Sequence, residues 1–86
     1  TEEIKVNCAS LRVDAIVAQL AHTSRSGAME LIRQGFVKVN DIVLEENTVL
    51  CYKDIVSIRR VGRFQFLDIE GTTRKNRNIL KFNKFI

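Results

Sequence analysis

The stretch SRSGAMELIRQGFVKVN, Ser24–Asn40, changes from a helical to a strand pattern within a few residues. Ser24 stands where an N-cap is favoured, and the apolar positions that follow at helical spacing predict a helix to about Gln34. Gly35 can adopt the left-handed conformation that ends many helices. The sequence FVKVN then alternates with period two, as a half-buried strand does.

A second helix is predicted immediately before this stretch. Between Leu11 and Ala21, apolar residues recur at Val13, Ile16, Val17 and Leu20, which makes one apolar stripe. The residue before this helix, Ser10, is the expected N-cap, and the single histidine His22 is expected to end it. Because only three or four residues separate the two helices, they should form a helical hairpin or corner.

The rest of the chain reads as strands. The turn residues Asn40–Asp41 favour a hairpin, since both tolerate a positive φ. The expected fold is α+β, a helical pair packed on a small antiparallel sheet of four to five strands. The expected strands lie at 36–40, 42–44, 54–60, 63–70 and 79–86, with a possible short first strand at 4–7 and another short one within 45–54.

Length and charge narrow the function. The 86 residues suffice for one domain, and the net charge of +4 favours anionic partners. Residues 1–52 hold five basic and seven acidic side chains, whereas residues 53–86 hold nine and three. No apolar run is long enough to cross a membrane, so no membrane partner is expected. Cys8 and Cys51 are expected to be reduced thiols of a cytoplasmic protein, and with one histidine no metal site is expected.

Nothing in the sequence indicates catalysis. It contains no phosphate-binding glycine loop, nucleophile elbow or cluster of metal-type ligands. We therefore expect no enzyme activity, no cofactor and no small-molecule substrate from this chain.

The basic residues of the first half are grouped instead. Arg12 lies at the edge of the first helix, Arg25 and Arg33 lie on the second, and Lys38 lies on the next strand. Any one of these could be an ordinary solvated side chain. As a group joined by short connections, they predict an anion-binding surface. Its candidate residues are Arg12, Ser24, Arg25, Ser26, Arg33, Gln34, Lys38 and Asn40.

The stretch LRVDAIVAQLAHTSRSGAMELIRQGFVKVND, followed by YKDIVSIR, resembles the RNA-binding domain named after ribosomal small-subunit protein S-four, the αL motif. The resemblance spans Leu11 to about Arg60. It implies binding to structured RNA, commonly ribosomal RNA or tRNA on the ribosome, through the candidate residues above. Three positions depart from the family pattern: Ala15 stands where many members have Lys, and Asp41 and Lys53 stand where they have Gly.

The continuation RRVGRFQFLDIEGTTRKNR is similar to YlmH-type proteins of Gram-positive bacteria and cyanobacteria. In that family this module is the C-terminal portion of a longer protein, linked to cell division by gene neighbourhood and to rescue of stalled ribosomal subunits. The resemblance implies an RNA-binding core at residues 1–60 and a basic β extension at 61–86. A secondary basic patch is expected at Arg59, Arg60, Arg63, Arg74, Lys75 and Arg77.

Three functions follow as hypotheses. The first is a non-catalytic RNA-binding module that recognises structured RNA on the ribosome and needs no oligomer. The second is a protein-interaction module of a cell-division-associated protein, because charge alone does not distinguish nucleic acid from an acidic protein. The third is the RNA-targeting domain of an RNA-modifying enzyme, such as a pseudouridine synthase, whose catalytic domain lies outside these residues.

Overall fold

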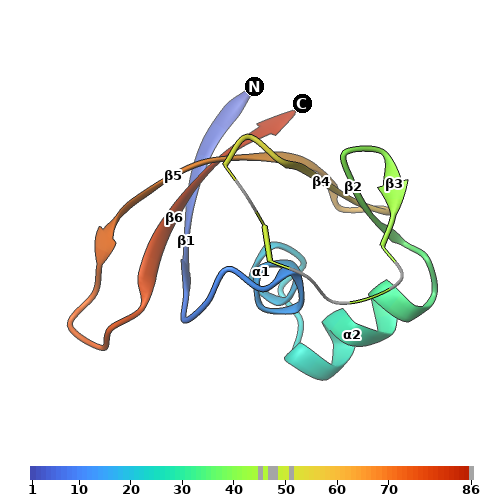
Figure 1. The fold of residues 1–86 in the computed structure, drawn as a ribbon, viewed down its shortest axis with the longest axis horizontal. Helices are drawn as coiled ribbons and strands as arrows, with labels where there is room; N and C mark the ends of the chain where they lie inside the picture. Colours follow the sequence, from blue (N-terminus) through green and yellow to red (C-terminus); the bar gives the residue numbers. More distant parts are fainter. Residues whose placement is uncertain (45, 47–48, 51, 86) are drawn as a thin grey trace.

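A computed structural model describes residues 1–44, 46, 49–50 and 52–85 of the chain (Figure 1). Within these residues the chain forms two short helices and six strands. In chain order these are β1 (Glu2–Cys8), α1 (Val13–Leu20), α2 (Arg25–Arg33), β2 (Val37–Val39), β3 (Ile42–Val43), β4 (Ile55–Ile58), β5 (Gly62–Thr72) and β6 (Asn78–Phe85).

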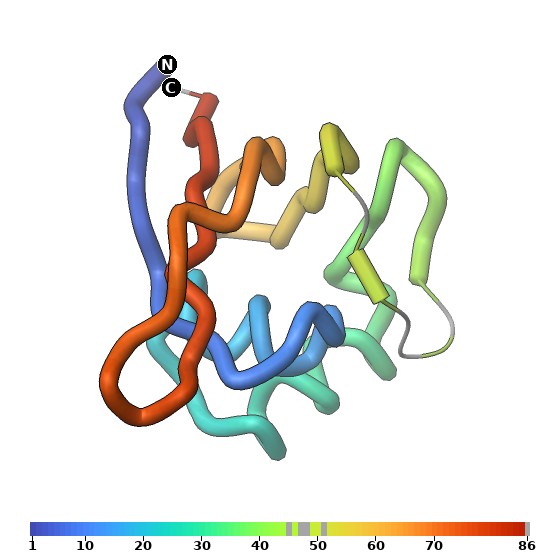
Figure 2. The backbone as a smooth tube through the Cα atoms, turned by 60° about the vertical axis from the view of Figure 1, so that its left-hand side comes forward, coloured from blue at the N-terminus to red at the C-terminus, as the bar shows by residue number. Residues whose placement is uncertain are grey.

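The described strands form one antiparallel sheet in the order β1-β6-β5-β4-β2-β3. The sheet arches over the helices, which both lie on its inner side (Figure 1). β6 runs between β1 and β5, and Glu2 is paired with Lys84, so the two ends of the chain lie side by side. The long β5–β6 hairpin extends on the side of the molecule opposite the short β2–β3 hairpin (Figure 2).

The expectation of a helical pair on a four- to five-stranded sheet is wrong, because the described chain is mostly a six-stranded sheet with two short helices. The possible short strand at 4–7 is a full strand that pairs with β6 from Glu2 to Cys8. The full length of β1 was not evident from the sequence, because its first two residues are exposed glutamates and only Cys8 is fully buried. Similarly, β5 continues to Thr72, past the expected end at Glu70, because it pairs with β6 across two register shifts.

The connection after β3 also differs from the expectation of a short strand within 45–54. Its described residues contribute one isolated bridge, between Val49 and Arg12. Glu45, Asn47, Thr48 and Cys51 lie outside the described residues, as does Ile86 of the expected last strand. The reduced thiol expected at Cys51 therefore lies outside them too.

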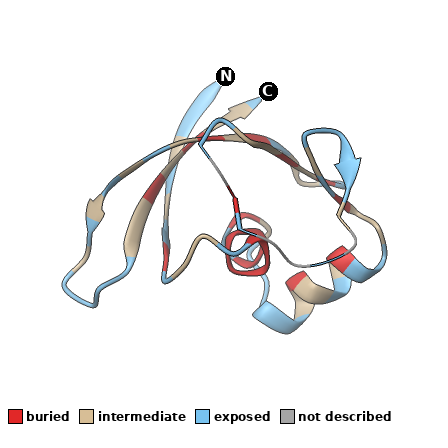
Figure 3. Ribbon diagram, in the orientation of Figure 1, coloured by how far each residue is buried: buried red, intermediate tan, exposed pale blue. Residues whose placement is uncertain are grey.

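The hydrophobic core lies between α1 and the inner face of the sheet (Figure 3). Every residue of α1 except Gln19 is buried, including Ala15 and Ala18 on the side away from the expected apolar stripe. This explains why that side carries only small side chains. From the sheet, the core receives Val37, Val56, Ile58, Phe64, Phe66, Leu80 and Phe82.

Three of the four helix ends lie at the residue that the sequence predicts. Ser24 is the N-cap of α2, and its hydroxyl accepts a hydrogen bond from the Gly27 amide at 3.0 Å, as expected. Ser10 is not the N-cap of α1: that position is Arg12, and the Ser10 hydroxyl instead accepts from the Arg12 amide. His22 and Gly35 end the two helices at φ +54° and +78°. Each is followed by an amide bonded five residues back, which is a Schellman motif.

The hairpin between β2 and β3 forms at the expected turn. Its two central residues, Asn40 and Asp41, have φ values of +53° and +67°. Positive φ at both positions is the type I′ geometry that matches the twist of the flanking strands. This short hairpin fixes the direction in which Lys38 leaves the sheet.

Candidate nucleic-acid interface

The helix corner is organised around a buried carboxylate. Asp14 is only 5% exposed, and its Oδ2 accepts hydrogen bonds from Arg25 Nη2 at 2.8 Å and Nε at 3.2 Å. Its Oδ1 accepts from the Ala15 amide at 2.8 Å, and the Arg12 guanidinium lies 3.9 Å away. The Arg25 guanidinium thus pairs with the buried Asp14 carboxylate, although about half of the Arg25 side chain remains exposed. Arg25 is therefore both a structural residue and a candidate ligand-binding residue.

The other candidates on α2 have separate environments. Arg33 donates to Glu30 at 3.1 Å, and the Gln34 side chain donates to the other oxygen of the same carboxylate at 3.3 Å. Ser26 is exposed in the first turn, while the Ser24 hydroxyl is occupied by the helix cap. The acidic Glu30 partly neutralises Arg33, so the far end of α2 is less cationic than its sequence suggests.

Asn40 has a structural role in the sheet. Its side-chain carbonyl accepts from the Ile55 amide at 3.0 Å, and its side-chain nitrogen donates to Asp54 at 3.0 Å. These bonds tie the β2–β3 turn to the start of β4. The Asn40 side chain thus has a structural role, while its role as a donor for a ligand stays a prediction, because the side-chain nitrogen carries a second hydrogen.

The loop that joins β5 to β6 holds three cations in a fixed shape. Backbone hydrogen bonds connect the Thr73 amide to the Arg77 carbonyl and the Asn76 amide to the Thr73 carbonyl. The Thr73 hydroxyl also accepts from the amides of Lys75 and Arg77, at 3.3 Å each. Arg74, Lys75 and Arg77 are exposed on this loop and line a shallow depression together with Asn7 and Thr73.

This loop approaches the helix corner. Arg77 and Arg25 line the same small cavity of about 180 Å³, together with residues of β1 and α1. We give the name corner surface to five cations: Arg74, Lys75 and Arg77 of this loop, Arg25, which lines the small cavity with Arg77, and Arg12, which lies beside Asp14. The secondary patch expected in the second half of the chain is thus divided, and this part of it joins the helix arginines.

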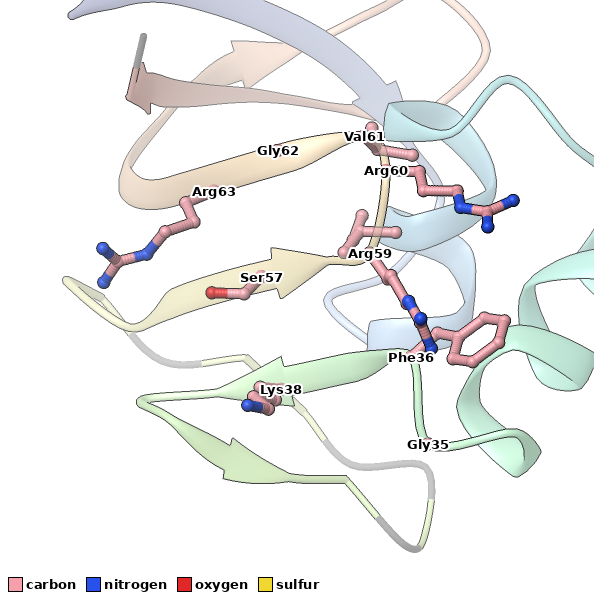
Figure 4. A pocket seen from close by; sticks show the side chains of 10 residues that line it. Gly35, Phe36, Lys38, Ser57, Arg59, Arg60, Val61, Gly62 and Arg63 are labelled. Carbon is pink, nitrogen blue, oxygen red and sulfur yellow. The ribbon is translucent and has the colours of Figure 1, made fainter.

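The other part lies on the sheet. A groove of about 730 Å³ collects Lys38 from β2 and Arg59, Arg60 and Arg63 from the β4–β5 turn and the start of β5 (Figure 4). We call it the sheet groove; its other lining residues are Gly35, Phe36, Ser57, Ile58, Val61 and Gly62. Lys38 points away from the helices because Val37 and Val39, its neighbours on β2, face them. The structure therefore groups Lys38 with the later arginines and not with Arg12 and Arg25.

Phe36 is the functional candidate that the sequence analysis overlooked. The guanidinium of Arg59 lies 4.8 Å from the centre of its ring, and the Arg59 amide donates to the Phe36 carbonyl at 2.9 Å. The signal in the sequence was an aromatic residue directly after the helix-ending Gly35. The structure adds that Phe36 precedes β2 and that the cation of Arg59 lies within reach of its ring.

Three other features bear on function in the part of the chain that the structure describes: metal-type ligands, the length of the helices and the thiol of Cys8. No group of three or more His, Cys, Asp or Glu side chains there is placed to hold a metal ion. Among these residues, neither helix is long and apolar enough to cross a membrane. Cys8 is buried, and burial raises the pKa of its thiol from the ordinary 9.0 to about 11, against a smaller opposite effect of Arg77 and Arg25. A thiol in this state is protonated near neutral pH.

Comparison with known proteins gives the chain a relative. It is 37% identical over 76 residues to a protein of Bacillus subtilis (strain 168) named ribosome-associated protein quality control protein P2. The similarity supports a YlmH-like relationship. The aligned residues make up 87% of this chain but 30% of the relative, so the chain spans less than a third of that protein. No protein-family model matches the chain.

Proposed function

We propose that this chain is a non-catalytic RNA-binding module that recognises structured RNA of the ribosome, ribosomal RNA or tRNA, in the cytoplasm. The observation that carries the proposal is the convergence of Arg25 and Arg77 on one cavity. These residues come from distant parts of the sequence. Arg74 and Lys75 line a depression with Arg77, and Arg12 lies beside the same carboxylate as Arg25. The name of the B. subtilis relative, a ribosome-associated protein, supports the ribosome as the partner.

The chemistry of the corner surface suits phosphate groups. Guanidinium groups bind phosphate oxygens with two parallel hydrogen bonds, and the loop backbone that carries Arg74, Lys75 and Arg77 is tied by hydrogen bonds to Thr73. Duplex RNA presents backbone phosphates and 2′-hydroxyls more readily than base edges. We therefore expect the corner surface to recognise the shape of folded RNA with little dependence on sequence.

Salt dependence tests this proposal. If about five phosphates are neutralised, the logarithm of the affinity for tRNA or a ribosomal RNA fragment should fall with the logarithm of salt at a slope of about −4. Fluorescence anisotropy of labelled RNA with the 86-residue chain would measure it. Arg77→Gln and Arg74→Gln should each reduce the steepness by about 0.7–0.9, whereas Lys53→Gln, which lies outside both cationic surfaces, should not.

A slope near −1, or affinities unchanged by both substitutions, would contradict the proposal. The alternative of a protein-interaction module would then be favoured if the chain captures an acidic protein in a manner that RNase does not affect. Arg33→Gln tests the far end of α2 separately, because that residue already pairs with Glu30 and should matter less.

A further inference from the structure

The sheet groove has a regular geometry across three strands. Lys38 on β2 is paired with Ser57 on β4, and Ser57 is paired with Arg63 on β5. Cross-strand partners point to the same face, so the three side chains form a row on the face away from the helices (Figure 4). Since neighbouring strands lie about 4.8 Å apart, the backbone positions of Lys38 and Arg63 are roughly 10 Å apart, and Ser57 lies between them.

The charge of the groove is of one sign. Every charged residue that the structure gives as lining it is a lysine or an arginine, within the described part of the chain. The exposed carboxylate of Asp41, in the β2–β3 turn, lies 3.9 Å from the Arg63 guanidinium. The cationic lining distinguishes the groove from α2, where Glu30 pairs with Arg33. An anionic ligand would thus meet four cations with little internal competition.

A flat surface borders this charge. Arg59 lies over the ring of Phe36 and is anchored to the same residue through its backbone. A guanidinium held in this way keeps its outer face free for another flat group, and nucleic-acid bases stack on Arg planes as well as on aromatic rings. A second pair of the same kind extends the row to β6, where Arg63 lies over the ring of its cross-strand partner Phe85 at 5.5 Å. Charge with stacking planes is the arrangement that binds single-stranded nucleic acid.

We propose that the sheet groove binds an unpaired segment of RNA, with phosphates on Lys38, Arg60 and Arg63 and a base stacked on Arg59. Duplex RNA would bind the cations through its phosphates but could not stack on the Arg59 guanidinium, because its base faces are covered by neighbouring bases. An acidic peptide would likewise gain nothing from Phe36 and Arg59 beyond charge. The stacking planes therefore favour unpaired RNA over both. The groove lies apart from the corner surface, so this inference does not require the corner surface to bind RNA.

Two substitutions test the stacking plane while they preserve charge. Arg59→Lys removes the flat group but not its charge, and Phe36→Leu removes the ring that supports it. Each should weaken binding of fluorescein-labelled decaadenylate at least about fivefold, as loss of a stacked base does. Neither should change binding of a ten-base-pair RNA duplex. Circular dichroism melts would establish that both variants fold.

Charge is tested by neutralisation. Arg63→Gln should make the salt dependence of decaadenylate binding shallower by about 0.7, the value for one contact to a single strand. Lys53→Gln is the matched control and should leave it unchanged, since Lys53 does not line the groove. Arg77→Gln should weaken binding of the structured RNA while leaving decaadenylate binding intact, which separates the two proposals.

Two results would overturn the inference. In the first, folded Arg59→Lys and Phe36→Leu bind decaadenylate as tightly as the parent chain. In the second, a decaglutamate peptide binds the parent as tightly as decaadenylate does, which would assign the groove to an acidic peptide.

Discussion

Asp14 and Arg25 form the contact that joins the first turns of α1 and α2. The carboxylate is buried and receives two hydrogen bonds from the half-exposed guanidinium, of which the shorter is 2.8 Å. Because a buried carboxylate is destabilising without partners, the fold at this corner depends on an arginine that also faces a possible ligand. Substitutions of Arg25 must therefore be interpreted with a stability measurement beside them.

Arg25→Gln should lower the free energy of unfolding by about 1–2 kcal/mol, since hydrogen bonds to a charged group are lost but the arginine is partly exposed. Arg25→Glu should be worse, because it would place a second carboxylate beside Asp14. Urea denaturation of the single variants, Asp14→Asn and the double variant would give the coupling energy. A coupling near zero would show that the pair contributes nothing to stability.

Gly27 is required by the close approach of the interhelix loop to α2. A β-carbon at this position would clash with the Thr23 hydroxyl and lie 3.3 Å from the Thr23 β-carbon. Gly27→Ala should therefore destabilise the chain by about 1–3 kcal/mol, although alanine is the better helix former. Thr23→Ala in the same chain removes the clashing atom and should recover most of the loss. If Gly27→Ala alone raises the melting temperature, the packing described here is wrong.

Lys53 has a backbone conformation that costs energy for any residue with a side chain. Its φ is +70°, and the family that the chain resembles has glycine at this position. Lys53→Gly should raise the free energy of unfolding by about 0.5–1 kcal/mol and the melting temperature by roughly 2–8 °C. Lys53→Ala is the matched control: it removes the same side chain but keeps the strain, so it should bring no such gain.

Cys8 gives the stability a dependence on alkaline pH. Its pKa is raised in the folded state, so the folded chain keeps the thiol proton in a range where the unfolded chain releases it. The contribution is fully present below pH 9.0 and is lost as the pH rises to about 11. The parent should lose about 2–3 kcal/mol more than Cys8→Ala over this range, which follows from the size of the shift. Parallel denaturation curves from pH 8.5 to 11 would measure the difference, and identical pH profiles would contradict it.

Local features of the fold could be predicted because their causes lie within a few residues. The cap at Ser24, the helix end at Gly35 and the turn at Asn40–Asp41 all depend on side-chain chemistry at one position. The sheet could not be predicted in full, since β1 is defined by its pairing with residues that lie 70 to 82 positions away. Ser10 had the right chemistry for a cap, but the helix begins later in the chain.

The cations could be chosen from the sequence, whereas their grouping could not. Lys38 was assigned to the helix arginines because the connections are short, but the alternation along β2 turns it to the opposite face of the sheet. Arg77 joins Arg25 only because the β5–β6 hairpin extends toward the helix corner. The partnership of Asp14 with Arg25 is likewise tertiary, because it joins two different helices, and no local pattern indicates it.

The position of β6 has a consequence for how the chain acquires its structure. A strand inserted between the most N-terminal strand and the centre of the sheet leaves β1 without a hydrogen-bonding neighbour until synthesis has passed residue 78. Closing this contact joins segments separated by nearly the whole chain, which slows folding relative to a protein with local contacts. A nascent chain emerging from the exit tunnel would hold an exposed, pairing-competent edge until β6 has been synthesised, and removal of β6 should leave the edge open to aggregation.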